Sequence, residues 1–168
     1  MLASITPSPL SRAAIADYAE RVAEKHHIFV NGESADIESL VDSLGGTIEV
    51  SESFVSPEAL TVRDRRDFTV HLPALTSHRR DRFTIAHEIG HYFLHYLQPK
   101  VTGPKDFGRG SRNTAETQAN YFAGALLMPE KRFREAWEKC GGDSWSVADL
   151  FGVSKSAASV RAQTLRLR

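Results

Sequence analysis

The stretch RFTIAHEIGHYFLH, from Arg82 to His95, has apolar residues at helical spacing and places three of the chain's seven histidines within nine residues. Each residue of a helix advances by about 100° around the axis, so His87, Glu88 and His91 fall on one arc about 100° wide. Apolar residues and a glycine occupy the opposite side. A helix of this kind buries most of its surface against other elements. The stretch therefore predicts a buried helix that shows one polar strip.

The polar strip has the spacing of a His-Glu-x-x-His metal motif. His87 and His91 are four residues apart, so they lie about 6 Å apart along the axis and can share one zinc ion. Glu88 reaches a metal-bound water rather than the metal, and can serve as the general base of peptide hydrolysis. The alternative is a histidine-rich helix without a metal, because the short string is only moderately specific by itself.

A catalytic zinc ion needs a third protein ligand and an open position. His95 lies about 12 Å along the axis from His87, too far for both to reach one ion, so we expect it to support the ligands instead. Glu116 is the better candidate, and Asn120, one turn later, would orient a metal-bound histidine. An alternative stays open, because Asn113 and Glu116 also resemble a capping box, in which the glutamate only binds backbone N–H groups.

The composition is that of a soluble globular protein. With 168 residues, 41% of them hydrophobic and 25% charged, the chain is long enough for one domain with its own core. The 21 basic and 21 acidic side chains cancel, so the chain has no overall attraction for nucleic acid or an anionic membrane. Cys140 is the only cysteine, which excludes an internal disulfide. We see no signal peptide or membrane-spanning run, and expect a cytoplasmic protein with no membrane association.

Capping signals and residue spacing predict several helices and a small sheet, with Ser8 as the first N-cap and a Gly- and Pro-rich loop over residues 98–113. We expect helices over residues 8–25, 36–44, 77–97, 113–127, 129–139, 146–151 and 154–165, and strands over 47–51, 59–63 and 68–72. The last two strands read as a hairpin. We expect one α+β domain over residues 1–168, with a short antiparallel or mixed sheet on one side of the active-site helix; it divides into N-terminal helices (1–45), a catalytic core (46–139) and a C-terminal segment (140–168).

The C-terminal segment has the pattern of a helix-turn-helix. Its apolar residues lie where such a motif needs them, and Gly152 falls at the turn. Arg161 interrupts the pattern at a position where an apolar residue is expected, and together with Lys155 and Arg166 it could bind nucleic acid locally. We favour the alternative, a helical hairpin that packs on the catalytic core or meets a protein partner.

Other residues are candidates for the cleft. Arg109 and Arg112, in the glycine-rich loop, could stabilise a transition state. Tyr92, Tyr96 and Tyr121 are equal candidates for stabilising the oxyanion.

The stretch RFTIAHEIGHYFLH followed by ETQANYFAGALLMP closely resembles the ImmA/IrrE family of metallopeptidases. The resemblance implies a zincin-like, minigluzincin fold in which the sheet packs beside the active-site helix. It implies His87, His91 and Glu116 as ligands of zinc, with manganese or iron as possible substitutes, and Glu88 as the general base. It also implies Asn120 as the residue that orients a ligand.

The resemblance further implies a protein partner. Members of this family often cleave or inactivate a helix-turn-helix repressor of the Xre type, so we expect a zinc-dependent endopeptidase with such a repressor or an antitoxin as its substrate. We expect an extended substrate to pair with an edge strand over residues 67–72. The main alternative is a toxin-like or regulatory protein that binds its repressor, antitoxin or DNA without proteolysis. A metal-dependent hydrolase of non-protein substrates is a further alternative.

Overall fold

The computed structural model describes residues 5–53, 59–108 and 113–168. Its elements follow in this order: α1 (Arg12–Lys25), α2 (Ile37–Ser43), β1 (Gly46–Val50), β2 (Ala59–Asp64), β3 (Asp67–Leu72), α3 (His78–His91), the π-helix η1 (Tyr92–Leu97), β4 (Lys105–Gly108), α4 (Thr114–Leu127), α5 (Glu130–Lys139), α6 (Ser144–Phe151) and α7 (Lys155–Thr164). This is the predicted mixture of helices with a small sheet. No helix among the described residues has the length and apolar character needed to cross a membrane.

The sheet has the strand order β1-β3-β2-β4. The expected hairpin forms, because β2 and β3 pair antiparallel, while β1 runs parallel to β3. The expectation that residues 67–72 form an edge strand is wrong, since β3 is paired on both sides. The edge next to β2 is β4, which lies in the segment expected to be a loop and pairs antiparallel with β2. Its four residues include one apolar side chain, Phe107, too little for a strand pattern to show.

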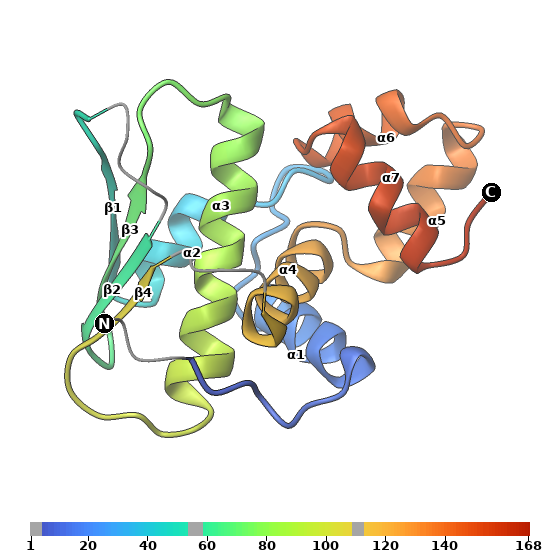
Figure 1. Cartoon of the computed structure of the whole chain (residues 1–168). Helices are drawn as coiled ribbons and strands as arrows, with labels where there is room; N and C mark the ends of the chain where they lie inside the picture. The colour runs from blue at the N-terminus through green and yellow to red at the C-terminus, as the bar shows by residue number, and fades with distance from the viewer. Residues whose placement is uncertain (1–4, 54–58, 109–112) are drawn as a thin grey trace.

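The helix α3 and its continuation η1 lie between the sheet and the other long helices (Figure 1). The sheet covers one side of α3, and α1 and α4 lie on the other. Every residue from Thr84 to Tyr96 is buried. The predicted buried helix is therefore confirmed, with the difference that its last six residues widen into a π-helix.

The helix α1 begins three residues later than expected. Ser11, rather than Ser8, is its N-cap and accepts a hydrogen bond from the N–H of Ala14. The peptide groups of Ser8 are instead hydrogen-bonded to the side chain of Gln118, at 2.9 and 2.8 Å. This pairing holds the backbone of Ser8 against Gln118 of α4, so the helix starts only after Ser11.

The helices α3 and α4 cross closely at Gly90. A Cβ atom at this position would lie 3.0 Å from the backbone oxygen of Ala119 and 3.1 Å from Cβ of Phe122. The glycine therefore lets the two backbones approach between His87 and His91. This approach brings the first turn of α4, which carries Glu116, over the polar strip of α3.

The C-terminal helices α6 and α7 form the expected helical hairpin. Gly152 at the turn is left-handed, with φ of 65°, and a Cβ there would lie 3.0 Å from Nε of Arg82. The predicted apolar positions are buried: Val147, Ala148, Phe151, Val153 and Ala158. Arg161 is buried among them, and its Nε donates a 2.9 Å hydrogen bond to the carbonyl oxygen of Met128. The hairpin thus packs against the rest of the chain, as expected, while local DNA binding stays the untested alternative.

Candidate metal centre

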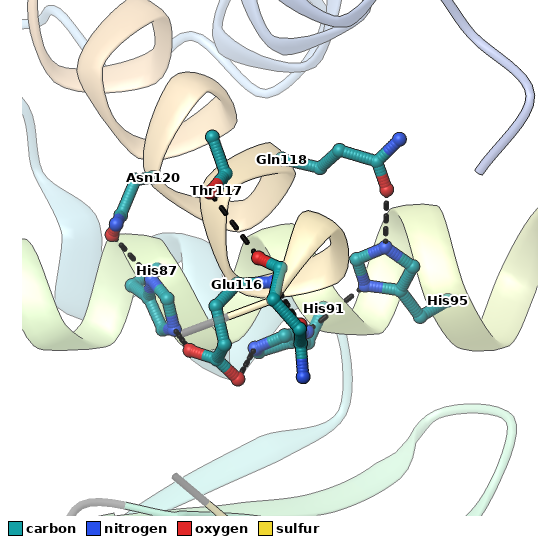
Figure 2. A network of polar contacts seen from close by, with 8 residues as sticks. His87, His91, His95, Glu116, Thr117, Gln118 and Asn120 are labelled. Atoms are coloured by element: carbon teal, nitrogen blue, oxygen red, sulfur yellow. Dashed lines mark hydrogen bonds and ion pairs between the residues drawn. The ribbon is translucent and has the colours of Figure 1, made fainter. Parts of the chain in front are cut away.

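Three side chains predicted as metal ligands meet at one buried point. His87 and His91 come from consecutive turns of α3, and Glu116 comes from the first turn of α4. One ligand atom of each lies within 4.8 Å of the others. The Nε2 atoms of the two histidines lie 2.9 and 3.0 Å from the two carboxylate oxygens of Glu116 (Figure 2). The cluster combines donors that are far apart in the sequence.

Glu116 takes part in only half of the capping box that the sequence allowed. Its backbone N–H donates a 3.0 Å hydrogen bond to Oδ1 of Asn113, which is the N-cap of α4. Its carboxylate is not turned back toward the helix start but lies against His87 and His91. The side chain is therefore free to act as a ligand while its peptide group is capped.

Each of the two histidines has a second contact on the ring nitrogen that faces away from Glu116. Nδ1 of His87 lies 2.8 Å from Oδ1 of Asn120, one turn after Glu116. Nδ1 of His91 lies 2.9 Å from Nδ1 of His95. The structure thus places both Asn120 and His95 where they can orient the ligands, and that role stays a prediction.

The contact chain continues beyond His95 to two residues that the sequence did not reveal. Nε2 of His95 lies 3.0 Å from Oε1 of Gln118, whose amide is paired with Ser8. The sequence did contain one signal for this contact. Gln118 lies on the apolar side of α4, and a buried amide needs a hydrogen-bond partner. The partner, Ser8, is 110 residues away in the sequence, where no local pattern could indicate it.

The charge of the cluster is divided unequally. Burial lowers the pKa of His91, and the charge of the nearby His87 lowers it further. The hydrogen bond between His91 and Glu116 raises this pKa but does not offset the two effects. Burial also disfavours a charge on His87, but the hydrogen bond with Glu116 and the charges of Glu88 and Glu116 raise its pKa overall. Burial opposes ionisation of Glu116, yet hydrogen bonds from both histidines hold its pKa well below its usual range. The cluster therefore favours an ionised carboxylate and attracts positive charge.

The donors fit a zinc ion. Two imidazoles and one carboxylate are a ligand set that zinc takes in catalytic sites, where a fourth position stays open. Asn120 Oδ1 can only accept a hydrogen bond, so Nδ1 of His87 donates to it and the lone pair of a neutral His87 lies on Nε2, facing Glu116. A lone pair and an ionised carboxylate at 2.9 Å repel each other unless a proton or a metal ion lies between them.

Glu88 adjoins the cluster on α3 and is 2% exposed. It is close enough for its charge to raise the pKa of His87. Phe107 of β4 stacks on the ring of His91, with centroids 5.6 Å apart, and so brings the edge of the sheet beside the site. The role of Glu88 as general base stays a prediction.

The other cleft candidates are placed as follows. Arg109 and Arg112 lie outside the described residues. The hydroxyl of Tyr92 accepts the N–H of Arg66 at 3.0 Å, and that of Tyr96 donates to the carbonyl oxygen of Gly103 at 2.7 Å. The O–H of Tyr96 is therefore already used as a donor, which weakens it as an oxyanion donor, whereas Tyr92 only accepts in its contact with Arg66.

A cavity of about 660 Å³ adjoins the metal centre. Thr84, one turn before Glu88, and Asn120 belong to its lining, which comes from α1, α3, α4 and α7. No acidic side chain of the described residues lines it, whereas four arginines do: Arg12, Arg79, Arg80 and Arg161. Arg79 and Arg161 have carboxylate partners in Asp149 and Glu20, whereas Arg12 forms no ion pair among the described residues.

Comparison with known proteins identifies the family of the chain. The IrrE N-terminal-like domain of peptidase family M78 matches residues 49–163. A radiation response metalloprotease, IrrE of Deinococcus radiodurans, is 37% identical over 82 residues, which are 48% of this chain and 25% of that protein. A transcriptional regulator of Mycobacterium tuberculosis has a similar fold, with a TM-score of 0.64 at 19% identity over 90% of this chain and 47% of the regulator. The matched part of the chain thus spans a quarter of the length of the metalloprotease, and about half of the length of the regulator.

Proposed function

Because the chain belongs to the family of the IrrE N-terminal-like domain, peptidase family M78, we propose that it is a zinc-dependent endopeptidase. In this proposal His87, His91 and Glu116 hold the metal, and Glu88 is the general base. The main supporting observation is the buried cluster of His87, His91 and Glu116. A second buried carboxylate, that of Glu88, lies next to it on α3, the helix of the two histidines. A purely structural metal site would have no use for a base at that position. The similarity to a protein described as a metalloprotease supports the same activity.

The chain's own residues supply most of the chemistry. When bound, zinc would act as a Lewis acid that activates water and the peptide carbonyl. Glu88 accepts the proton of the attacking water and passes it to the leaving amine. Asn120 holds His87 with Nε2 toward the cluster. Phe107 covers one face of His91 and limits the access of bulk water.

We propose that an extended polypeptide pairs with β4 rather than with β3. β4 is paired only with β2 among the described strands, so its other side offers backbone groups to a substrate. The contact of Phe107 with His91 places this edge beside the metal ligands. A peptide added to β4 would therefore run past the cluster.

The cavity supports a substrate with an acidic residue among apolar neighbours. The guanidinium of Arg12 stacks on the ring of Tyr121 at 4.0 Å and has no ion pair among the described residues. Apolar side chains, among them Phe83 and Val160, form the rest of its wall. An acidic side chain entering the cavity would gain a charge-assisted hydrogen bond at Arg12.

The proposed partner is a helix-turn-helix repressor of the Xre type, or an antitoxin, in the cytoplasm. This partner rests on the resemblance of the HEIGH and LLMP motifs to the ImmA/IrrE family. The competing proposal is a regulator that binds such a repressor without cleaving it. The two differ in whether Glu88 is needed.

The test is metal analysis together with incubation of the protein with a panel of Xre-type repressors from its source organism. The parent should hold one zinc ion per chain and cleave one of them. Glu88→Ala should hold zinc and bind the same repressor but not cleave it, whereas Glu24→Ala, an exposed residue of α1, should behave as the parent. Equal binding without cleavage by the parent and Glu88→Ala would favour the regulatory alternative.

The acidic preference has its own test. Arg12→Glu should lower kcat/KM on the cleaved repressor by about tenfold or more, because a like charge opposes the acidic side chain. The zinc content should not change. Arg21→Glu, on the same helix but outside the cavity, is the matched control. Equal kcat/KM for the two variants would remove the cavity from substrate recognition.

A further inference from the structure

The peptide groups of Ser8 fix the orientation of the Gln118 side chain. The N–H of Ser8 donates to Oε1 of Gln118 at 2.9 Å, and Nε2 of Gln118 donates to the carbonyl oxygen of Ser8 at 2.8 Å. Both residues are buried, with exposed fractions of 8% and 7%. A flipped amide would place donor against donor and acceptor against acceptor. One orientation of Gln118 is therefore set by a backbone segment 110 residues away.

The fixed amide determines which nitrogen of His95 carries a proton. Oε1 of Gln118 can only accept, and Nε2 of His95 lies 3.0 Å from it, so Nε2 is the donor. The ring of His95 is 1% exposed, and its two nitrogens contact the Gln118 amide and the His91 ring, neither of which is a carboxylate. A buried ring without a carboxylate partner is held in its neutral form. Its Nδ1 is left with a lone pair and can only accept a hydrogen bond.

The tautomer of His95 in turn determines that of His91. Their Nδ1 atoms lie 2.9 Å apart in a buried contact, so one must donate and the other accept. Since Nδ1 of His95 accepts, Nδ1 of His91 carries the proton. The Nε2 atom of a neutral His91 then has a lone pair that faces Oε1 of Glu116 at 3.0 Å, so, as at His87, a proton or a metal ion must lie between the two atoms.

We infer that Gln118, held by the backbone of Ser8, is a positioning residue that acts through His95 to keep Nε2 of His91 available to the metal. His87 reaches the same state in one step, through the side-chain oxygen of Asn120. Among the described residues no side-chain amide contacts His91 directly, and Gln118 reaches it only through the ring of His95. The inference rests on the proposed metal site, but its evidence is the direction of four hydrogen bonds.

The inference predicts that Gln118→Met impairs metal binding although Gln118 is not a ligand. Methionine has a similar length but can neither pair with Ser8 nor accept from His95. The zinc Kd, measured by chelator competition, should rise by about 10- to 100-fold, as is typical when a group that orients a ligand is lost. In NMR spectra of the protein labelled with ¹⁵N-histidine, His95 should lose its single tautomer and His91 its slowly exchanging Nδ1–H. A purely structural Gln118 would change stability without changing these tautomers.

Ser8→Ala is the matched control. It keeps both peptide groups that hold Gln118 and removes only the hydroxyl, which donates to Gln98 and accepts from the N–H of Leu10. We expect the tautomers and zinc Kd of this variant to stay within twofold of the parent. Ser8→Pro, which removes the N–H, should instead shift both readouts in the direction of Gln118→Met. This second variant keeps the test open if Gln118→Met fails to fold, as judged by circular dichroism.

A zinc Kd and ring tautomers in Gln118→Met equal to those of the parent would overturn the inference. So would an Nε2–H tautomer of His91 in the zinc-loaded parent. If the parent binds no zinc, the proposed function fails, but the ring N–H assignments of His95 and His91 in the metal-free protein still test the hydrogen-bond directions. The two failures are therefore distinguishable.

Discussion

At the scale of single residues, Glu116 combines two tasks that different atoms perform. Its N–H is capped by Asn113, and its carboxylate faces His87 and His91. A residue at this helix position normally interacts favourably with the N-terminal end of the dipole. Here the two tasks can be separated, because each depends on a different side chain.

We predict that Glu116→Ala mainly weakens zinc binding, whereas Asn113→Ala mainly lowers the free energy of unfolding. Glu116→Ala removes a ligand, so zinc binding should weaken by more than the 10- to 100-fold typical of residues that only support a ligand. Asn113→Ala should lower the free energy of unfolding by about 1 kcal/mol through the lost cap, with zinc retained. Chelator competition and urea unfolding measure the two effects. Zinc retained in a folded Glu116→Ala would show that the glutamate is only a helix-start residue.

The metal-free protein should lose stability in acid through His95. Burial lowers its pKa from 6.5 to about 4, so the unfolded chain binds this proton more readily than the folded one. The contribution of the neutral His95 ring to the free energy of unfolding is fully present above pH 6.5 and is lost as the pH falls toward 4. The total loss is about 3 kcal/mol. Urea unfolding at several pH values, with a chelator present, checks this. His95→Gln removes the titrating ring, so parallel curves for the two proteins would contradict the prediction.

At the scale of the elements, the α3–α4 crossing decides whether the ligands can meet. We predict that Gly90→Val lowers the free energy of unfolding by about 1–3 kcal/mol, because the new side chain overlaps Ala119 and Phe122. It should also weaken zinc binding, since α4 moves outward and carries Glu116 with it. Thermal unfolding of the metal-free protein and a zinc titration give the two values.

Gly124 is the matched glycine on the same helix pair. A Cβ there would meet nothing within 4 Å, so Gly124→Ala should stabilise the protein by about 0.5–1 kcal/mol through helix propensity alone. Its zinc affinity should equal that of the parent. If Gly90→Val bound zinc as well as Gly124→Ala does, close crossing of the helices would not be what positions Glu116.

The elements also show what the sequence could and could not predict. The polar strip of α3 and the Glu116 helix have helical spacing, and the β2–β3 hairpin alternates, so local patterns were sufficient for them. β4 was missed because its pairing with β2 is set by tertiary contact and not by its own four residues. The same reason explains why β3 was taken for an edge. Gln118 and Ser8 meet across 110 residues, a relation that no local period expresses.

At the scale of the whole molecule, Arg82 joins three parts of the chain. Its side chain leaves the start of α3 and is buried, 4% exposed. Nη1 donates to the carbonyl oxygen of Ala35 at 2.8 Å, and Nε donates to that of Gly152 at 3.1 Å. The segment before α2 and the turn of the C-terminal hairpin are thereby fixed to the helix that carries the metal ligands.

We predict that Arg82→Met lowers the free energy of unfolding by about 2–4 kcal/mol, because the buried carbonyl oxygen of Ala35 and the partly buried one of Gly152 lose their donor while the apolar volume is kept. Arg79→Ala is the control one turn away. Arg79 pairs with Asp149 at the surface and also donates a 3.0 Å hydrogen bond to the carbonyl oxygen of Val153. Because these contacts are partly exposed, the loss of Arg79 should cost only about 1 kcal/mol. Urea unfolding of the metal-free proteins measures both. Equal losses would mean that the hairpin is held by its apolar contacts, and that Arg82 is not the residue that connects it to the metal-binding helix.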